Sequence, residues 1–403
     1  MQNKFLNDLI KKAFSPKKIG SSGLEINNVF IKSATFEGMY SDGIPNQKLI
    51  DHHVTLVKGG VGLTTVSYGA VSADARTFDD QMYVNRESLK ALEILAQKVH
   101  KAGGKVSMQL THCGYFSKNK KAKSILAPSK LFNAYGALSG LAFSKAMSEK
   151  DMERIIEDFV QAALALKSIG IDAVEIHMGH GYLLSQFLSP LTNKRNDAFG
   201  GNIVNRSRFP LRLVSKVIDA VGLDFPVLVK LNLDDGFKKG FSLNDCIHVA
   251  KDLEKIGCSA IILSGGFTSK SPFYLMRGKV PLKGMIQNAG SWTEKITMML
   301  FGPLIIKKYT FTPNFFLAQA IKVRKAVGLD LVYLGGVDSK EGIEDILEAG
   351  FNFIALARPL IHDPEFLNKL KQGSIEKSLC NRCNQCIVEM DRDGIKCVLD
   401  SAG

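Results

Sequence analysis

The chain has 403 residues, of which 45% are hydrophobic and 23% are charged, and its formal net charge is +13. This length is sufficient for a large core, organised as one big domain or two ordinary ones. Lysine and arginine are spread along the chain and carry no interleaved aromatic residues where they are densest, at 118–123, which argues against a nucleic-acid partner. The longest apolar run, 298–306, is too short to span a bilayer, and the N-terminus has no signal-peptide features, so we expect a cytoplasmic protein.

One pattern repeats along the chain, in which a helical segment ends in glycine and a short apolar, β-branched run follows. Glycine is favoured at helix ends because it adopts the left-handed backbone conformation at little cost. Near-continuous apolar strands are typical of a parallel sheet that is covered on both faces. The pattern predicts eight strands, at residues 28–33, 61–67, 105–109, 171–176, 225–230, 258–263, 329–334 and 351–356.

The best-defined helix is predicted at residues 148–169, where Ser148 can cap the N-terminus and Asp151 lies in the first turn. Eight strand–helix units predict an α/β fold of the TIM (β/α)8 barrel type, with the chemistry at the carboxyl ends of the strands. A doubly wound sheet is the alternative, but it would require a glycine-rich nucleotide-binding turn, which this sequence lacks. We assign residues 1–375 to the barrel and 376–403 to a short cysteine-rich tail.

Two insertions interrupt the repeating pattern. Residues 111–147 follow the third strand, and residues 267–313 follow the sixth strand and are long for a connection. The second insertion is rich in methionine and aromatic residues, including Tyr274, Trp292 and Phe301. We interpret it as a lid over the barrel mouth, and the alternatives are a packing or homo-oligomer surface and a membrane-touching patch.

The fourth strand leads into the most informative segment of the chain. His177, His180 and Tyr182 place two imidazoles and a phenol within six residues. Such a set suits a carbonyl oxygen that gains negative charge while a neighbouring carbon takes a proton. The segment therefore indicates an active site at the end of this strand.

Other strands also end in residues that suit a cofactor. Gln109 ends the third strand, and its amide can both donate to and accept from the edge of a pyrimidine-like ring. Lys230 ends the fifth strand, where burial of its charge requires a nearby anion or electron-rich ring. Gly335 and Gly336 after the seventh strand, with Arg358 after the eighth, match the position where TIM barrels commonly hold phosphate.

The segment 177–201, HMGHGYLLSQFLSPLTNKRNDAFGG, resembles the active-site stretch of the old yellow enzyme family of flavin-dependent ene-reductases. The resemblance covers about residues 20–372 and implies that FMN lies across the barrel mouth, with NADH or NADPH as the reductant. The cofactor-binding positions that it implies are Ser33, Ala34, Thr35, Tyr68, Gln109, Lys230, Gly265, Gly335, Gly336, Ala357 and Arg358.

The resemblance also implies that His177 and His180 bind a substrate carbonyl and that Tyr182 donates a proton. The expected reaction is reduction of the C=C bond of a small α,β-unsaturated carbonyl compound. Flavin-dependent demethylation or dehydrogenation on the same barrel, and a non-catalytic electron-storing flavoprotein, are the alternatives. Ala34 departs from the proline of many relatives, and the polar residue beside the flavin is either Thr35 or, in a register shifted by one residue, Phe36.

Four cysteines crowd the C-terminal tail in a pattern typical of metal ligands. The tail resembles the four-cysteine segment that follows the related barrel at the N-terminus of 2,4-dienoyl-CoA reductase, although two of the gaps are one residue shorter here. A [4Fe-4S] cluster, zinc and unligated thiols all stay open. The candidate ligands are Cys380, Cys383, Cys386 and Cys397.

Overall fold

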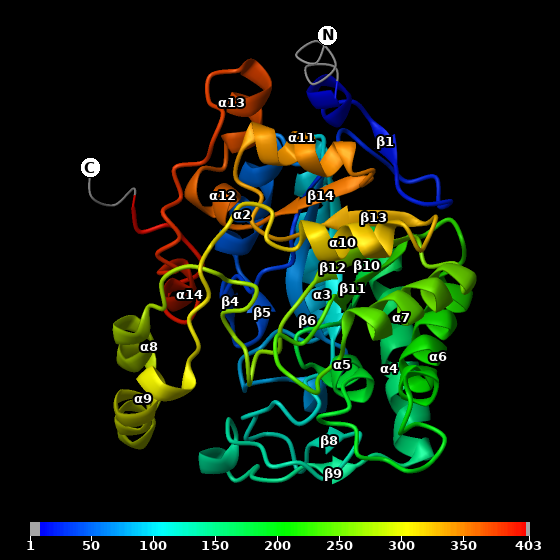
Figure 1. Ribbon diagram of the computed structural model, residues 1–403, viewed down its shortest axis with the longest axis vertical. Coiled ribbons are helices and arrows are strands. Elements are labelled where there is room, and N and C mark those ends of the chain that lie inside the picture. The colour runs from blue at the N-terminus through cyan, green and yellow to red at the C-terminus, as the bar shows by residue number, and fades with distance from the viewer. Residues whose placement is uncertain (1–8, 400–403) are drawn as a thin grey trace.

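The computed structural model describes residues 9–399, and its centre is a closed barrel of eight parallel strands (Figure 1). Each strand pairs with the next barrel strand along the chain, and the last pairs with the first. The TIM-barrel prediction is therefore confirmed. The barrel strands are β3 (Phe30–Lys32), β6 (Leu63–Ala70), β7 (Lys105–Thr111), β10 (Ala173–Met178), β11 (Val227–Asn232), β12 (Ala260–Ser264), β13 (Asp330–Tyr333) and β14 (Phe353–Leu356).

Helices surround the barrel and bury the outer face of its strands (Figure 1). All eight residues of β6 and all six of β10 are buried, because one set of alternating side chains fills the barrel and the other packs under the helices. The surrounding helices are α2 (Gln47–Lys58), α3 (Arg86–Lys101), α4 (Glu149–Ser168), α5 (Leu183–Leu188), α6 (Ile203–Val221), α7 (Leu243–Lys255), α10 (Leu317–Arg324), α11 (Lys340–Glu348), α12 (Arg358–His362) and α13 (Phe366–Gln372).

The predicted helix at 148–169 is confirmed as α4, together with its cap. The Ser148 hydroxyl accepts a hydrogen bond from the Asp151 N–H at 3.2 Å, and the Asp151 carboxylate accepts one from the Ser148 N–H at 2.8 Å. This reciprocal capping box satisfies two backbone donors that a helix N-terminus leaves without partners.

Most barrel strands begin two residues later than the sequence pattern indicates. After α4, the Gly170 N–H bonds to the Lys167 carbonyl at 3.2 Å and the Ile171 N–H to the Leu166 carbonyl at 3.2 Å. These residues therefore still belong to the turn that ends the helix, although their side chains are those of a strand. This strand also ends two residues later than predicted, at Met178, so His177 lies inside β10 rather than after it.

The two insertions lie at different places. Residues 111–147 hold β8 (Leu126–Ala127) and β9 (Lys145–Ala146), while the second insertion holds α8 (Leu282–Asn288) and α9 (Trp292–Ile305). Figure 1 shows α8 and α9 outside the ring of barrel helices, near α14 (Cys386–Glu389) of the tail. The Asn288 side chain donates to the Val388 carbonyl at 2.6 Å, which ties α8 to the tail. The lid interpretation of 267–313 stays a prediction.

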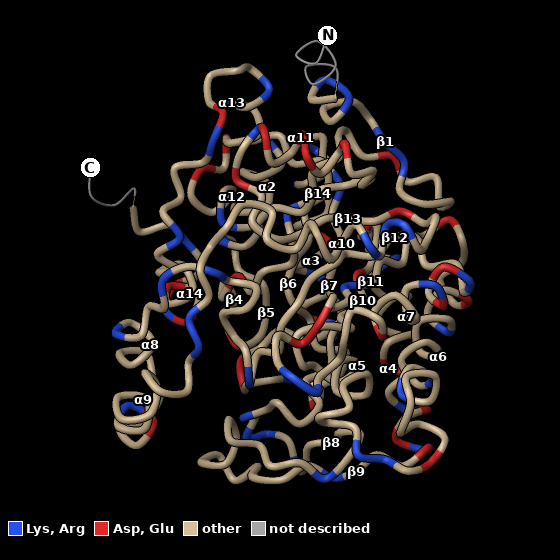
Figure 2. Tube along the Cα trace, viewed as in Figure 1, with Lys and Arg blue, Asp and Glu red and all other residues tan. Residues whose placement is uncertain are grey.

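Three short strand pairs outside the barrel carry no signal in the sequence pattern. Two of them are antiparallel hairpins near the N-terminus, β1 (Lys17–Lys18) with β2 (Glu25–Ile26) and β4 (Tyr40–Ser41) with β5 (Ile44–Pro45), and the third joins β8 to β9. Lysine and arginine are distributed over the whole trace and interspersed with acidic residues, as Figure 2 shows. Within residues 9–399, every helix is too short or too polar to cross a bilayer.

Candidate active site

Three neighbouring strands bring the predicted polar residues to one layer of the barrel interior. The parallel register pairs His177 of β10 with Lys230 of β11, and Glu175 of β10 with Gln109 of β7. Residues two apart on a strand point to the same face, so Glu175 and His177 share the inward face of β10. Gln109, His177 and Lys230 are therefore brought together, as the strand-end reasoning predicts.

A buried carboxylate that the sequence reasoning missed organises this layer. Glu175 accepts a hydrogen bond from the Gln109 amide nitrogen at 2.5 Å and pairs with the Lys230 ammonium at 2.9 Å. Gln109 and Glu175 are 2% exposed and Lys230 is 1% exposed, so the ammonium requires this counter-charge. Because the amide nitrogen of Gln109 points to Glu175, its oxygen is left to accept from the Ser67 hydroxyl at 3.3 Å. Glu175 thus fixes the orientation of both predicted cofactor ligands.

The hydrogen bonding of His177 defines which ring nitrogen can act on a substrate. Its Nδ1 accepts from the Gly179 N–H at 3.3 Å, so the neutral ring carries its proton on Nε2. Burial, followed by the neighbouring His180 and Lys230, lowers the pKa of His177 well below its ordinary value. The ring is therefore neutral near pH 7 and presents a hydrogen-bond donor.

His180 lies on the turn after β10 with a left-handed backbone, φ 58°, which is uncommon outside glycine. Its N–H donates to the Asn232 side chain at 3.1 Å, and its Nε2 lies 2.7 Å from the Ser264 hydroxyl. The two imidazole rings are 4.9 Å apart at 87°. Burial and then Lys230 lower the pKa of His180 to about 3, so it is also neutral near pH 7.

Tyr182 completes the predicted catalytic set. Its ring centroid lies 4.7 Å from that of His177 and 5.4 Å from that of Tyr68. Burial, followed by the nearby Tyr68, raises the pKa of Tyr182 well above its ordinary value, which keeps the phenol protonated. Two neutral imidazoles and a protonated phenol therefore meet at the carboxyl end of β10.

The residues after β3 form one wall of the site. The Ser33 hydroxyl is 3.5 Å from the Lys230 ammonium, and the Thr35 hydroxyl donates to the Ser33 carbonyl at 3.1 Å. The Phe36 ring lies 5.5 Å from the Tyr68 ring. Thr35 and Phe36 thus both belong to this wall, and the hydroxyl of Thr35 is used in a local hydrogen bond to Ser33.

A second buried carboxylate, also missed from the sequence, supports this wall from behind. Glu37 forms a buried ion pair with Lys32 and accepts hydrogen bonds from the Ser67 N–H at 3.0 Å and the Tyr40 hydroxyl at 3.2 Å. These contacts fix the backbone that carries Tyr68. For both Glu175 and Glu37, the sequence feature that could have indicated a buried carboxylate is a charged residue within or beside an apolar strand.

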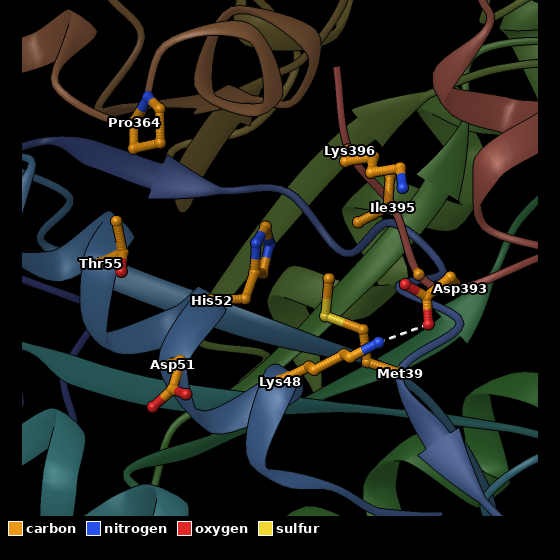
Figure 3. Close-up of a pocket in the computed structure, with 10 residues that line it drawn as sticks. Met39, Lys48, Asp51, His52, Thr55, Pro364, Asp393, Ile395 and Lys396 are labelled. Atoms are coloured by element: carbon orange, nitrogen blue, oxygen red, sulfur yellow. Dashed lines mark hydrogen bonds and ion pairs between the residues drawn. The ribbon is translucent and has the colours of Figure 1, made fainter. Parts of the chain in front are cut away.

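A hollow of about 400 Å³ lies outside the barrel, between α2 and residues 393–396 (Figure 3). It is lined by His52, Met39 and Thr55, and an ion pair between Lys48 and Asp393 crosses one side of it. None of the predicted catalytic or cofactor residues lines it. The carboxyl ends of the barrel strands therefore stay the candidate site.

The predicted phosphate end has glycines where side chains would collide with neighbouring groups. Gly335 and Gly336 follow β13 with φ of 143° and 84°. A Cβ on Gly336 would lie 2.7 Å from the Phe315 ring and 3.0 Å from the Thr312 carbonyl. A Cβ on Gly265, after β12, would lie 2.9 Å from the Phe316 ring. Close packing of the Phe315 and Phe316 rings against the chain thus requires glycine here.

Arg358 begins α12, directly after Ala357, and its guanidinium reaches the cysteine-rich tail. One terminal nitrogen donates to the Arg277 carbonyl at 2.7 Å and to the Asn384 side chain at 2.9 Å. Asn384 in turn donates to the Met276 carbonyl at 2.7 Å. The phosphate role of Arg358 stays a prediction, and its bond to the tail is a contact that the sequence did not indicate.

The residues at the mouth fit the FMN that the resemblance implies. Gln109 and Lys230 each keep an N–H beyond the one that they give to Glu175, as the edge of a flavin ring requires. The phosphate positions stay as the resemblance implies them, because aromatic rings occupy the space beside the glycines after β12 and β13. When bound, FMN would be held by these groups.

The tail cysteines are partly exposed, whereas the three cysteines of the barrel are buried. Burial raises the pKa of Cys386 to about 11, an effect that the nearby Arg358 opposes. The Cys397 sulfur lies 3.3 Å from His362. Among residues 9–399, three or more His, Cys, Asp or Glu side chains nowhere lie close enough together to hold a metal ion. A metal on the tail cysteines therefore stays a prediction, and no reaction step is assigned to one.

Comparison with known proteins identifies the family. The family model described as NADH:flavin oxidoreductase / NADH oxidase matches residues 12–266. The chain is 34% identical over 393 residues to the 4,4′-dithiodibutanoate disulfide reductase of Rhodococcus erythropolis, covering 96% of this chain and 95% of that protein.

Two solved structures share the fold. The old yellow enzyme homologue from Zymomonas mobilis has a TM-score of 0.69 and 19% identity, with 91% of this chain and 94% of that chain covered. A 2-naphthoyl-CoA reductase complex has a TM-score of 0.79 and 21% identity, and covers 96% of this chain, which spans 56% of that longer chain. The chain therefore belongs to the NADH:flavin oxidoreductase / NADH oxidase family, the old yellow enzyme family that its sequence resembles, and is an FMN-dependent NADH or NADPH oxidoreductase.

Proposed function

We propose that this protein reduces the C=C bond of α,β-unsaturated carbonyl compounds, using NADH or NADPH as the source of electrons. The observation that carries the proposal is the convergence of two neutral imidazoles and a protonated phenol after β10, beside Gln109 and Lys230. FMN, when bound at the mouth, supplies the hydride chemistry. The protein's own residues bind, polarise and protonate the substrate.

The two histidines act on the substrate oxygen in this proposal. Nε2–H of His177 and a ring N–H of His180 donate to the carbonyl oxygen, which gains negative charge as the β-carbon receives hydride. Neutral donors suit this task because two positively charged imidazoles, buried side by side, would repel each other and the nearby ammonium of Lys230. Each oxyanion donor of this kind typically stabilises the transition state by ~2.7–4 kcal/mol.

Tyr182 delivers the proton to the α-carbon. Its raised pKa keeps the phenol protonated across the physiological range, so the donor is loaded whenever substrate binds. Its place beside His177 puts the phenol next to the carbonyl-binding group. A general acid in this position typically contributes a factor of about 10²–10⁴ in rate.

The cofactor side is assigned by resemblance together with the contacts described above. When FMN is bound, Gln109 and Lys230 would hold the pyrimidine edge of its ring, and Tyr68 and the residues after β3 would border the ring. Residues at the ends of β13 and β14 would hold its phosphate. The groups assigned to these borders are Ser33, Ala34 and Thr35 for the ring, and Gly265, Gly335, Gly336, Ala357 and Arg358 for the phosphate.

The test is anaerobic oxidation of NADPH by the FMN-loaded protein with cyclohexenone. We expect stoichiometric formation of cyclohexanone. Flavin reduction without turnover would contradict the proposal and favour a dehydrogenase, a demethylase or an electron-storing flavoprotein. His248→Ala, in α7 on the outside of the barrel, is a control that should leave turnover unchanged.

A second candidate is reduction of an organic disulfide, favoured by the full-length similarity to the Rhodococcus enzyme. The balanced reaction takes one hydride and one proton per disulfide and releases two thiols. The same phenol would protonate the departing sulfur. Incubation with 4,4′-dithiodibutanoate and NADPH, with titration of the released thiols, separates this activity from alkene reduction.

For the tail we propose a [4Fe-4S] cluster on the four cysteines, supported by their spacing and by the charge of Arg358, which interacts with Cys380, Cys383 and Cys386. Zinc and free thiols are the competing outcomes. Iron and zinc determination on protein purified without oxygen decides among them. Conversion of Cys383 to Ser should remove the metal if the proposal holds, and an unchanged metal content would contradict it.

A further inference from the structure

A groove of about 780 Å³ lies between the C-terminal end of α9 and the loop that follows β11. Its apolar wall includes Leu304 and Ile305, which are 83% and 71% exposed. Carboxylates are absent from its lining. Four exposed lysines complete the lining, and we call it the lysine groove: Lys238, Lys270, Lys307 and Lys308.

The positive charge of the lysine groove is not neutralised by the protein. Within residues 9–399, none of the four lysines forms an ion pair. The two carboxylates that directly precede the groove residues in the sequence are engaged elsewhere. Asp234 accepts from the Tyr274 hydroxyl at 2.9 Å, and Asp235 accepts from the Ser189 hydroxyl at 2.6 Å. Several like charges without a counter-ion attract a polyanion.

The lysine groove and the catalytic turn share one loop. The Thr268 N–H donates to the His180 carbonyl at 2.9 Å, and the Lys270 N–H donates to the Phe267 carbonyl at 2.9 Å. Phe267 also packs against Phe237 of the groove, with ring centroids 5.8 Å apart. Residues 267–270 therefore connect the turn that carries His180 to the lining of the lysine groove.

We propose that the lysine groove binds the phosphates of a polyphosphorylated ligand whose other end reacts at the barrel mouth. This proposal rests on the proposed function, and it specifies the class of ligand that the active site accepts. Two ligands share this chemistry: the reductant, if it is NADPH with its additional phosphate, and the substrate, if its unsaturated acyl group is carried as a coenzyme A thioester. The apolar wall suits the uncharged middle part of either molecule.

The test compares Lys307→Gln/Lys308→Gln with a matched control in the FMN-loaded protein. Lys322→Gln/Lys325→Gln removes the same charge from exposed lysines at the C-terminal end of α10, which faces away from the mouth. Each exposed ion pair contributes modestly, so the groove variant should weaken binding of the phosphorylated ligand by about 3- to 30-fold. The control should change it less than about twofold.

Two arms identify the source of the phosphates. Rapid-mixing measurements of flavin reduction give the apparent dissociation constants of NADPH and NADH. Perturbation of the flavin spectrum gives those of crotonyl-CoA and of the phosphate-free crotonyl N-acetylcysteamine thioester. Weakening of NADPH alone assigns the groove to its additional phosphate, and equal weakening of NADPH and NADH assigns it to the diphosphate that they share. Weakening of crotonyl-CoA alone assigns the groove to the substrate.

Equal effects on phosphorylated and phosphate-free ligands would overturn the proposal, as would equal effects of groove and control variants or no effect at all. Both readouts precede alkene reduction. A protein that binds through these lysines but turns over no enone would therefore contradict the proposed function and leave the groove assignment standing.

Discussion

Replacement of Glu175 by Gln tests whether one carboxylate organises the cofactor side of the site. The change keeps the size of the side chain but removes the charge that compensates Lys230. It also replaces the second carboxylate oxygen by a donor, whereas Gln109 and Lys230 both contact the first oxygen. We expect a less stable protein with a lower affinity for FMN.

The magnitude follows from the contact distances. At the 2.9 Å between the Glu175 carboxylate and the Lys230 ammonium, Coulomb's law with an effective dielectric constant of about 20 gives an attraction of about 6 kcal/mol. The amide oxygen of the new Gln recovers part of this by accepting from Lys230. Breaking one partner of a buried ion pair typically costs about 3–5 kcal/mol, and we expect a loss in this range.

Urea unfolding of the FMN-loaded protein measures the loss as a change in apparent free energy of unfolding. Glu153→Gln is the matched control, because it removes a charge from a solvent-exposed pair with Arg212 and should cost much less. The double variant Glu175→Gln/Lys230→Met should recover a substantial part of the loss, since it removes the uncompensated charge. A loss for Glu175→Gln as small as that of the control, or strict additivity in the double variant, would refute the reasoning.

Three further results are expected from the charges and packing of the site. The rate of enone reduction should not change between about pH 5.5 and 9. The reason is that the pKa of His180 is about 3 and the pKa of Tyr182 is far above its ordinary value, so neither group titrates in this range. A bell-shaped profile centred near pH 7 would contradict this prediction. Stability should fall as pH drops from about 6.5 toward 3, by up to about 1.4 kcal/mol per pH unit for each buried neutral histidine, because the unfolded chain takes up protons that the folded chain excludes. His180→Asn should make this slope shallower in acid titrations followed by circular dichroism, and an unchanged slope would remove His180 from the explanation. Gly336→Ala should lower FMN affinity, measured by fluorescence on dilution, because its Cβ would meet Phe315; unchanged affinity would argue against a tight glycine turn beside the phosphate.

The barrel could be predicted because each strand–helix unit can be recognised from a short stretch of its own sequence. The glycine that ends a helix and the apolar run after it are both readable without knowledge of the partner strands. The strand starts were displaced by two residues because the turn after a helix such as α4 continues through Gly170 and Ile171. That turn depends on hydrogen bonds, which side-chain patterns do not encode.

The candidate site was predictable to the extent that its residues are neighbours in sequence or follow strands. His177, His180 and Tyr182 lie within six residues of one another at the end of β10, and barrel topology alone brings Gln109 and Lys230 to the same end. Glu175 escaped prediction because its two partners come from other strands, and only the register of the barrel reveals the shared contact.

The exposure of α9 and the bond between Arg358 and Asn384 escaped prediction for the same reason. The apolar side chains of α9 are typical of a packed segment, yet six of them are at least 50% exposed, and the sequence does not encode which elements surround a helix. The Arg358–Asn384 contact joins two segments whose relative placement depends on the path of the tail.

The most direct test of the central claim is the oxidative half-reaction of His177→Ala/His180→Ala, followed by rapid mixing of the pre-reduced protein with cyclohexenone. The account predicts that NADPH reduces the flavin of this variant at close to the normal rate, while reoxidation by the enone slows by at least about 10³-fold, since one such donor alone is worth about 10²–10³. Reoxidation by the enone at a rate close to that of the unmodified protein would contradict the account.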